Sequence, residues 1–101
     1  MENIVKQGMA NLFKGKEGVG GKLYLTDQQL IHKAHKANIQ RGKVEINLID
    51  IDHLELYTNK IFGISLIKNG LMVVAKDGKQ YKFVVNKRED WKREIERLLE
   101  N

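Results

Sequence analysis

An alternation of apolar and polar residues with a period of two runs through the middle of the chain and restricts what it can fold into. Leu23 and Leu25 share one face of a predicted strand, and Lys22 and Tyr24 share the other. Successive side chains of a β-strand point to opposite faces, so this pattern predicts a half-buried strand. Similar stretches recur at spacings typical of an antiparallel sandwich or barrel.

The alternation changes phase within residues 44–57. Val44 to Leu48 alternate in one phase, whereas Ile49 and Ile51 follow the other. A slip of one residue exchanges the two faces of a strand, so a phase change marks a bulge or bend. We therefore expect two strand pieces joined by a kink.

The stretch LMVVAKDGKQYKFVV contains a hairpin signal at Asp77-Gly78. Both residue types tolerate a positive φ, which two-residue hairpin loops require. A two-residue loop sets the cross-strand pairs and predicts an apolar face made of Met72, Val74, Tyr81 and Phe83. Asn69-Gly70 is a second turn signal upstream.

The last segment has helical spacing. Its apolar residues recur at i, i+4, i+7 and i+8, which predicts one stripe along a helix, and they are Trp91, Ile95, Leu98 and Leu99. Asn86, with Glu89 three residues later, resembles a capping box. Trp91 is the sole tryptophan, and we expect it to plug the core at an open end of the sheet.

These signals add up to a mainly β chain of about seven strands and one C-terminal helix. The length of 101 residues favours a single domain. We expect one domain over residues 1–101, with an N-terminal extension at 1–8 and a capping helix at 87–100. The expected architecture is a seven-stranded bent antiparallel barrel or sandwich.

Composition excludes several classes of protein. The chain has no cysteine, which excludes a disulfide framework, zinc fingers and thiol catalysis. No apolar run approaches the roughly 20 residues of a membrane span, and the N-terminus lacks a signal-peptide pattern. These features favour a cytoplasmic protein.

Catalytic motifs are missing as well. The sequence contains no HExxH, no G-x-S-x-G and no paired nucleophile and base, so we expect no enzyme activity and no cofactor. Asp50, Asp52 and His53 are chemically able to hold a metal. A solvated kink explains them more simply, and no metal site is expected.

Positive charge is unevenly distributed. The formal net charge is +5; residues 14–43 hold seven Lys or Arg and two acids, whereas residues 44–57 hold four acids and no Lys or Arg. Such a basic surface fits an anionic partner, although lysines also keep a small protein soluble.

The run from Ala10 through the stretch Gly20 to Asp27, followed by Leu30 and Ile31, resembles the GRAM domain, which has a glycine before an L-x-L-T strand. Val44-Glu45-Ile46, the hairpin at Asp77-Gly78 and the helix near Trp91 follow in the family's order. The resemblance spans about residues 9–99. It implies a pleckstrin-homology-like fold, a seven-stranded bent barrel with a C-terminal helix.

The resemblance also implies a ligand site at the open end of the barrel, where relatives bind phosphoinositides or acidic lipids. By position the candidate residues are Lys14, Lys16, Lys22, His35, Lys36, Arg41 and Lys43. The second strand lacks the final Arg of the Lys/Arg-x-Arg motif of lipid-binding pleckstrin-homology domains. Specific headgroup capture is therefore less expected than diffuse attraction to an acidic membrane.

Two further features bear on the site. Gly18, Gly20 and Gly21 do not open a Walker loop, which needs Gly-Lys-Ser/Thr before a helix; we expect them to turn the chain into the second strand. His32 stands where the family usually places an inward aromatic residue. We interpret it as a hydrogen-bonded core histidine, with a ligand or switch role as the alternative.

The expected function is a non-catalytic binding module that recognises an anionic membrane surface or a protein. The alternative is a pure protein-interaction or homo-oligomerising scaffold without a lipid ligand, because exposed sheet edges can accept a partner strand. If Phe62 is exposed, it suits either a membrane or a partner. Nucleic acid is not expected, since no RNA-recognition motif or helix-turn-helix is visible.

Overall fold

Seven strands and one α-helix follow one another along the chain. The structure is a computed structural model that describes residues 3–15, 17–35, 42–61 and 64–100, with the backbone alone for 59–61 and 64–68. The elements are β1 (Ile4–Lys14), β2 (Glu17–Thr26), β3 (Gln29–Ala34), β4 (Lys43–Asn47), η1 (Leu48–Asp50), β5 (Ile51–Ile61), β6 (Ile64–Ala75), β7 (Gln80–Val85) and α1 (Arg88–Leu99).

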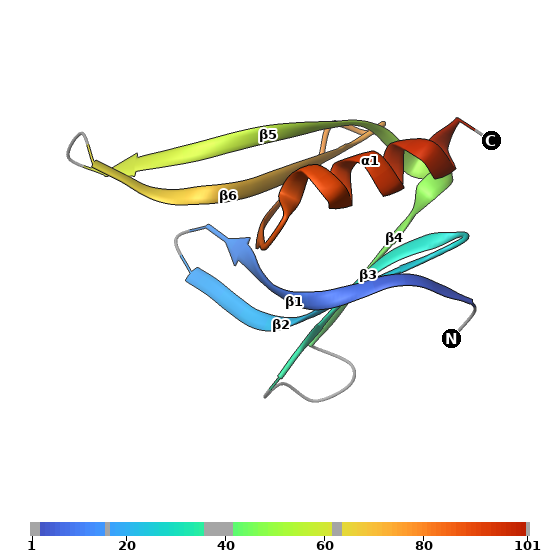
Figure 1. Cartoon of the computed structure of the whole chain (residues 1–101), viewed down its shortest axis with the longest axis horizontal. Coiled ribbons are helices and arrows are strands. Elements are labelled where there is room, and N and C mark those ends of the chain that lie inside the picture. Colours follow the sequence, from blue (N-terminus) through green and yellow to red (C-terminus); the bar gives the residue numbers. More distant parts are fainter. Residues whose placement is uncertain (1–2, 16, 36–41, 62–63, 101) are drawn as a thin grey trace.

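All seven strands belong to one antiparallel sheet in the order β4-β3-β2-β1-β7-β6-β5. The sheet is bent, so that β5 and β6 lie over β1, β2 and β3 (Figure 1). The expected mainly β architecture with a C-terminal helix is confirmed. No pairing joins β4 to β5 within the described residues, so the sheet is open and not a closed barrel.

The core lies inside the bend. Its buried side chains come from β1 to β7, η1 and α1, and Leu23, Leu25 and Leu30 are fully enclosed. Lys22 and Tyr24 are only half-buried, as the alternation of β2 predicts. At the end of β2, Thr26 Oγ1 accepts the backbone N–H of Gln29 at 2.9 Å and closes the turn into β3.

The phase change within residues 44–57 is confirmed as a break in the strand. β4 ends at Asn47, the 3-10 turn η1 follows, and β5 begins at Ile51. The backbone N–H of Leu48 donates to the Gln28 carbonyl at 2.9 Å. The break carries the chain from one end strand of the sheet to the other.

The hairpin between β6 and β7 is shifted by one residue from the prediction. Ala75 N–H donates to the Lys79 carbonyl at 2.8 Å, so the loop has three residues and ends at Gly78, with φ of 90°. Asp and Gly also suit this loop, a turn followed by a left-handed residue. The slip exchanges the faces of β6, and the core takes Leu71 and Val73 in place of Met72 and Val74.

The predicted turn at Asn69-Gly70 is also wrong, because β6 runs through both residues. Gly70 is buried opposite Tyr57, and a Cβ on Gly70 would lie 2.7 Å from the Tyr57 ring. The glycine therefore serves a close approach between two strands.

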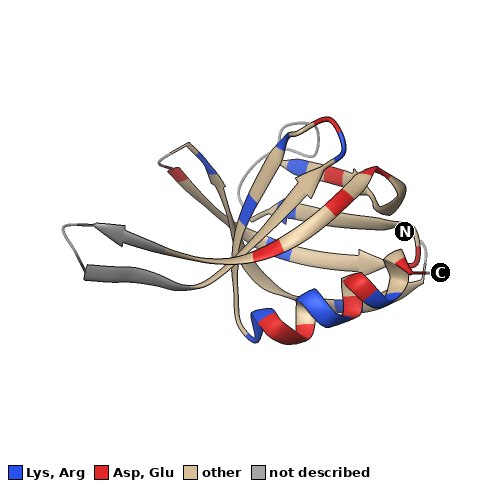
Figure 2. Cartoon of the chain, turned by 90° about the horizontal axis from the view of Figure 1, so that it is seen from above, with Lys and Arg blue, Asp and Glu red and all other residues tan. Residues whose placement is uncertain are grey.

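Helix α1 packs on β5, β6 and η1 and carries acidic and basic residues along its length (Figure 2). Trp91 and Ile95 are buried, as the stripe predicts. The capping box is wrong: the N-cap is Lys87, in the left-handed conformation, without a side-chain cap. At the other terminus β1 begins at Ile4, so residues 4–8 of the expected extension are strand.

Candidate functional site

A groove opens between the β1–β2 hairpin and the adjoining ends of β3 and β4. Its volume is about 930 Å³, and Leu12, Val19 and Val44 contribute its apolar lining. Lys14, Glu17 and His35 are exposed at its margin. A concave surface with an apolar lining and a few polar groups is the usual form of a small-ligand site.

His32 lies in the wall of this groove. It is 2% exposed, and its Nε2 lies 3.0 Å from the Ala10 carbonyl oxygen. A carbonyl can only accept, so Nε2 carries a proton and Nδ1 takes up the second proton when the ring becomes charged. The interpretation as a hydrogen-bonded core histidine is confirmed.

Burial, and to a smaller extent charged neighbours, make protonation of His32 difficult. Burial lowers the pKa of His32 most, the hydrogen bond to Ala10 opposes this, and the positive charges of His35 and Lys14 lower the pKa further. Three groups that can carry positive charge therefore meet at one groove. An anion there would relieve their mutual repulsion.

Gly21 makes room for His32. A Cβ on Gly21 would clash with the Lys33 carbonyl oxygen and lie 2.8 Å from His32 Cε1. The expectation that the glycines of the stretch at 18–21 turn the chain is wrong, because all of them lie within β2. The turn into β2 uses Gly15 instead, with φ of 64°.

The predicted site residues do not all converge. Lys14 and His35 line the groove, but Lys22 and Lys43 do not. Lys22 is one residue out of phase with the inward Leu23, and Lys43 is out of phase with Val44, so both point to the outer face. Lys16, Lys36 and Arg41 lie outside the described residues, as does Phe62.

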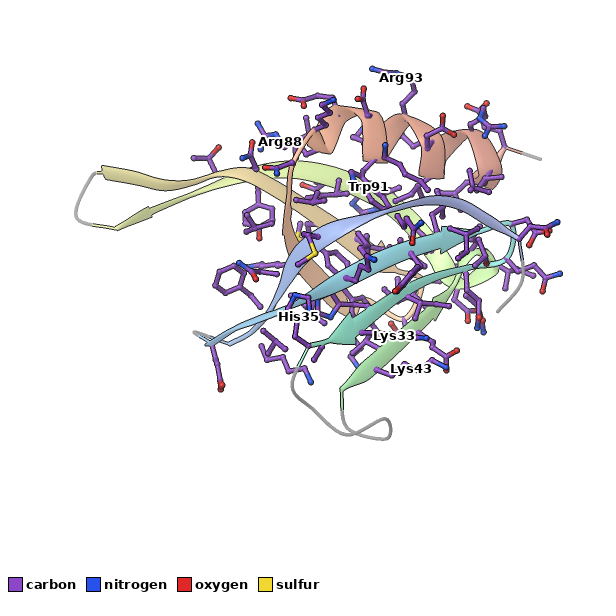
Figure 3. The ribbon with its side chains drawn as sticks, turned by 60° about the horizontal axis from the view of Figure 1, so that its bottom comes forward. Lys33, His35, Lys43, Arg88, Trp91 and Arg93 are labelled. Carbon is purple, nitrogen blue, oxygen red and sulfur yellow. The ribbon has the colours of Figure 1, made fainter. Side chains whose placement is uncertain are left out.

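Sequence reasoning missed Lys33, which is the direct cross-strand partner of both Lys22 and Lys43. Figure 3 shows Lys33, Lys43 and His35 at the same side of the molecule, away from Arg88, Trp91 and Arg93. Lys33 follows the inward His32 in β3, so its side chain points to the outer face. Only the register of β3 between its neighbours brings the three lysines into a row.

A second groove, of about 680 Å³, lies between η1 and the C-terminal end of α1. Asp27 and Asp52 line it together with Lys76. Its charged groups do not favour an anion, so the groove beside His32 is the better site for one.

His53 forms a separate charged cluster on β5. Its Nδ1 lies 2.7 Å from Asp52 Oδ2 and its Nε2 lies 2.8 Å from Glu55 Oε2. The hydrogen bond to Asp52, followed by that to Glu55, raises the pKa of His53. Both ring nitrogens thus face carboxylates. No group of three or more metal-ligating side chains suited to a metal occurs in the described part of the chain.

Solved structures share this arrangement of strands and helix. The C-terminal domain of an unknown protein from Leishmania infantum matches with a TM-score of 0.82 at 12% identity, over 99% of this chain and 86% of that one. The Slm1 PH domain matches at 0.72 and 16% identity, over 97% of each chain. The N-terminal PH domain of human ARAP2 matches at 0.72 and 16% identity, over 93% and 77%.

The chain has a pleckstrin-homology-like fold. No family model matches the sequence, and no curated protein matches it. The fold is thus shared with proteins whose sequences are only 12% and 16% identical to this one. Within the described residues, no helix has the length and apolar character needed to cross a membrane.

Proposed function

We propose that this pleckstrin-homology-like chain is a non-catalytic module of the GRAM type that binds a phosphate-bearing group in the groove beside His32. The observation that carries the proposal is the meeting of Lys14, His32 and His35 at one groove. Glu17 is the single carboxylate among the described lining residues. The Lys14 ammonium can form a charge-assisted hydrogen bond to phosphate, and an imidazole N–H can donate a further hydrogen bond.

Structural neighbours support phosphate as the chemistry. The Slm1 PH domain has been crystallised with phosphoserine and with D-myo-inositol-4-phosphate. For this chain we favour the headgroup of an acidic lipid, met by peripheral association with a membrane in the cytoplasm. A phosphorylated protein is the other source of the same group.

The sequence supports modest selectivity. The β2 segment that begins Lys22-Leu23-Tyr24 has no arginine after its lysine, and arginine is the residue that grips phosphate with two parallel hydrogen bonds. Lysine and histidine act as single charges. We therefore infer weak recognition of one phosphate group, strengthened by general attraction to a negative surface.

Amide chemical shifts measured while D-myo-inositol 4-phosphate is added test this proposal. We expect shifts at Lys14 and at residues 32–35. The double variant Lys14→Gln with His35→Gln should weaken binding about tenfold, because Lys14 supplies a charged hydrogen bond and His35 supplies a second hydrogen bond. The control Lys79→Gln should bind as the parent does.

The proposal fails if no amide responds, or if the responding amides lie away from the groove. Tighter binding of O-phosphoserine than of the inositol phosphate would instead favour a phosphorylated protein partner. A dimer in solution whose formation blocks the groove would favour the scaffold alternative.

A further inference from the structure

Three lysines form a row across the outer face of the sheet. Lys22 of β2 is paired with Lys33 of β3, and Lys33 is paired with Lys43 of β4. Neighbouring strands lie about 5 Å apart, so the three lysine side chains project side by side from the same face of the sheet. Like charges directly opposite each other destabilise a sheet, and the row therefore has an electrostatic cost in the free protein.

Local contacts neutralise only part of this lysine row. The ammonium groups of Lys22 and Lys33 lie 5.9 and 5.5 Å from the centre of the Tyr24 ring. Lys43 Nζ lies 3.5 Å from Glu45 Oε2. Glu45 is the one carboxylate in an ion pair with the row within the described residues. Two positive charges thus remain without a compensating charge there.

The shape of the row favours a flat anionic partner. The lysines stand on a sheet face, and Met9, the partner of Lys22 on β1, is 57% exposed. Ammonium groups beside an exposed apolar side chain suit the boundary between lipid headgroups and acyl chains. Stacked nucleic-acid bases need open aromatic faces, and the Tyr24 ring is already approached by two lysines.

The row adjoins the groove along the chain. Lys33 directly precedes Ala34, and Lys43 directly follows Gly42, and both neighbours line the groove. The labelled residues of both sites lie on one side of the molecule (Figure 3). We propose that the lysine row is a second contact surface, which rests on an acidic membrane while the groove holds a headgroup. This inference rests on the proposed function.

Vesicle binding of the variant Lys22→Gln, Lys33→Gln and Lys43→Gln tests the row. The probe is phosphatidylcholine vesicles with and without phosphatidylserine at low salt. Each lysine near an acidic membrane strengthens binding about fivefold, so we expect a loss of roughly a hundredfold for the triple variant. High salt should remove most of this difference, because it screens exposed charges.

The matched control is Lys76→Gln, Lys79→Gln and Lys82→Gln, which removes the same charge from exposed positions of β6–β7. It should weaken vesicle binding far less. Equal losses of vesicle binding in both triple variants, or no loss in the row variant, would overturn the proposal that the lysine row contacts the membrane. The proposal would also be overturned if the parent bound a single-stranded RNA oligonucleotide and the row variant lost that binding but kept its binding to vesicles.

A soluble ligand separates the two sites. The row variant should still bind D-myo-inositol 4-phosphate as the parent does, because the groove is intact. Loss of the soluble ligand together with the vesicles would contradict an independent row. If the parent binds acidic vesicles through the row but never binds the soluble ligand, the groove proposal fails and the row stands.

Discussion

At the scale of single residues, two histidines have opposite responses to their surroundings. His32 is buried, and its pKa is lowered from 6.5 chiefly by burial. His53 is exposed between Asp52 and Glu55, and its pKa is raised from 6.5 chiefly by the hydrogen bond to Asp52. The fold therefore opposes protonation of the first and favours protonation of the second.

The sign of each effect on stability follows by linkage. A lowered folded pKa means that the unfolded chain binds the proton more readily, so His32 destabilises the fold as the pH falls below 6.5. A raised folded pKa means that His53 stabilises the fold below 6.5, and this contribution disappears as the pH rises through the folded pKa.

We expect His53→Gln to lower the free energy of unfolding at about pH 5 and to leave it nearly unchanged at about pH 8. The reason is that only the protonated imidazole gains from the two carboxylates. Urea unfolding at the two pH values measures the difference. An equal change at both would show that the cluster acts by packing and not by charge.

At the scale of elements, the N-terminus of α1 does not form the capping box that its residue types predict. Asn86 and Glu89 have the residue types of a capping box, yet the N-cap is Lys87 with φ of 56° and ψ of 50°. Arg88 explains part of the geometry, because its guanidinium donates to the carbonyls of Tyr57 and Gly70 at 2.8 and 3.2 Å. These contacts tie the first turn of α1 to β5 and β6.

We expect Lys87→Gly to raise the free energy of unfolding by about 1 kcal/mol, because glycine adopts a positive φ without strain. Asn86→Ala should change it by less than about 0.5 kcal/mol, since no capping bond is lost. Thermal and urea unfolding measure both variants. A large loss of unfolding free energy in Asn86→Ala, together with no gain in Lys87→Gly, would instead support a capping box at Asn86.

At the scale of the whole molecule, Trp91 connects helix α1 to strand β1 inside the bent sheet. Its side chain is 2% exposed, and a Cβ on Gly8 would lie 3.5 Å from its Cζ2. The Lys6 ammonium lies 5.2 Å from the ring centre. The helix thus places one large ring against β1 and also packs on β5 and β6.

We expect Trp91→Ala to cost about 3–5 kcal/mol, a large share of the roughly 5–15 kcal/mol that stabilises a small domain. Trp91→Phe should cost clearly less, because most of the apolar volume stays. Circular dichroism in urea is the suitable measurement, since neither variant has a tryptophan. A cost below about 1 kcal/mol for Trp91→Ala would mean that the ring does not hold the layers together.

The sequence by itself determined the period of each element. Alternation located the strands, the phase change located η1, and the stripe through Trp91 and Ile95 located the buried face of α1. These features are local, because side-chain direction depends on the backbone of the same few residues. They also placed His32, two residues after Leu30, on the inward face.

Only the tertiary structure decided the register and the meeting of distant strands. The hairpin signal at Asp77-Gly78 fits loops of two or three residues, and that choice exchanged the faces of β6. Gly21 and Gly70 are explained by a carbonyl and a ring from neighbouring strands. The lysine row depends on the pairing of β2, β3 and β4, and pairing is a property of three strands together that no single stretch of sequence encodes.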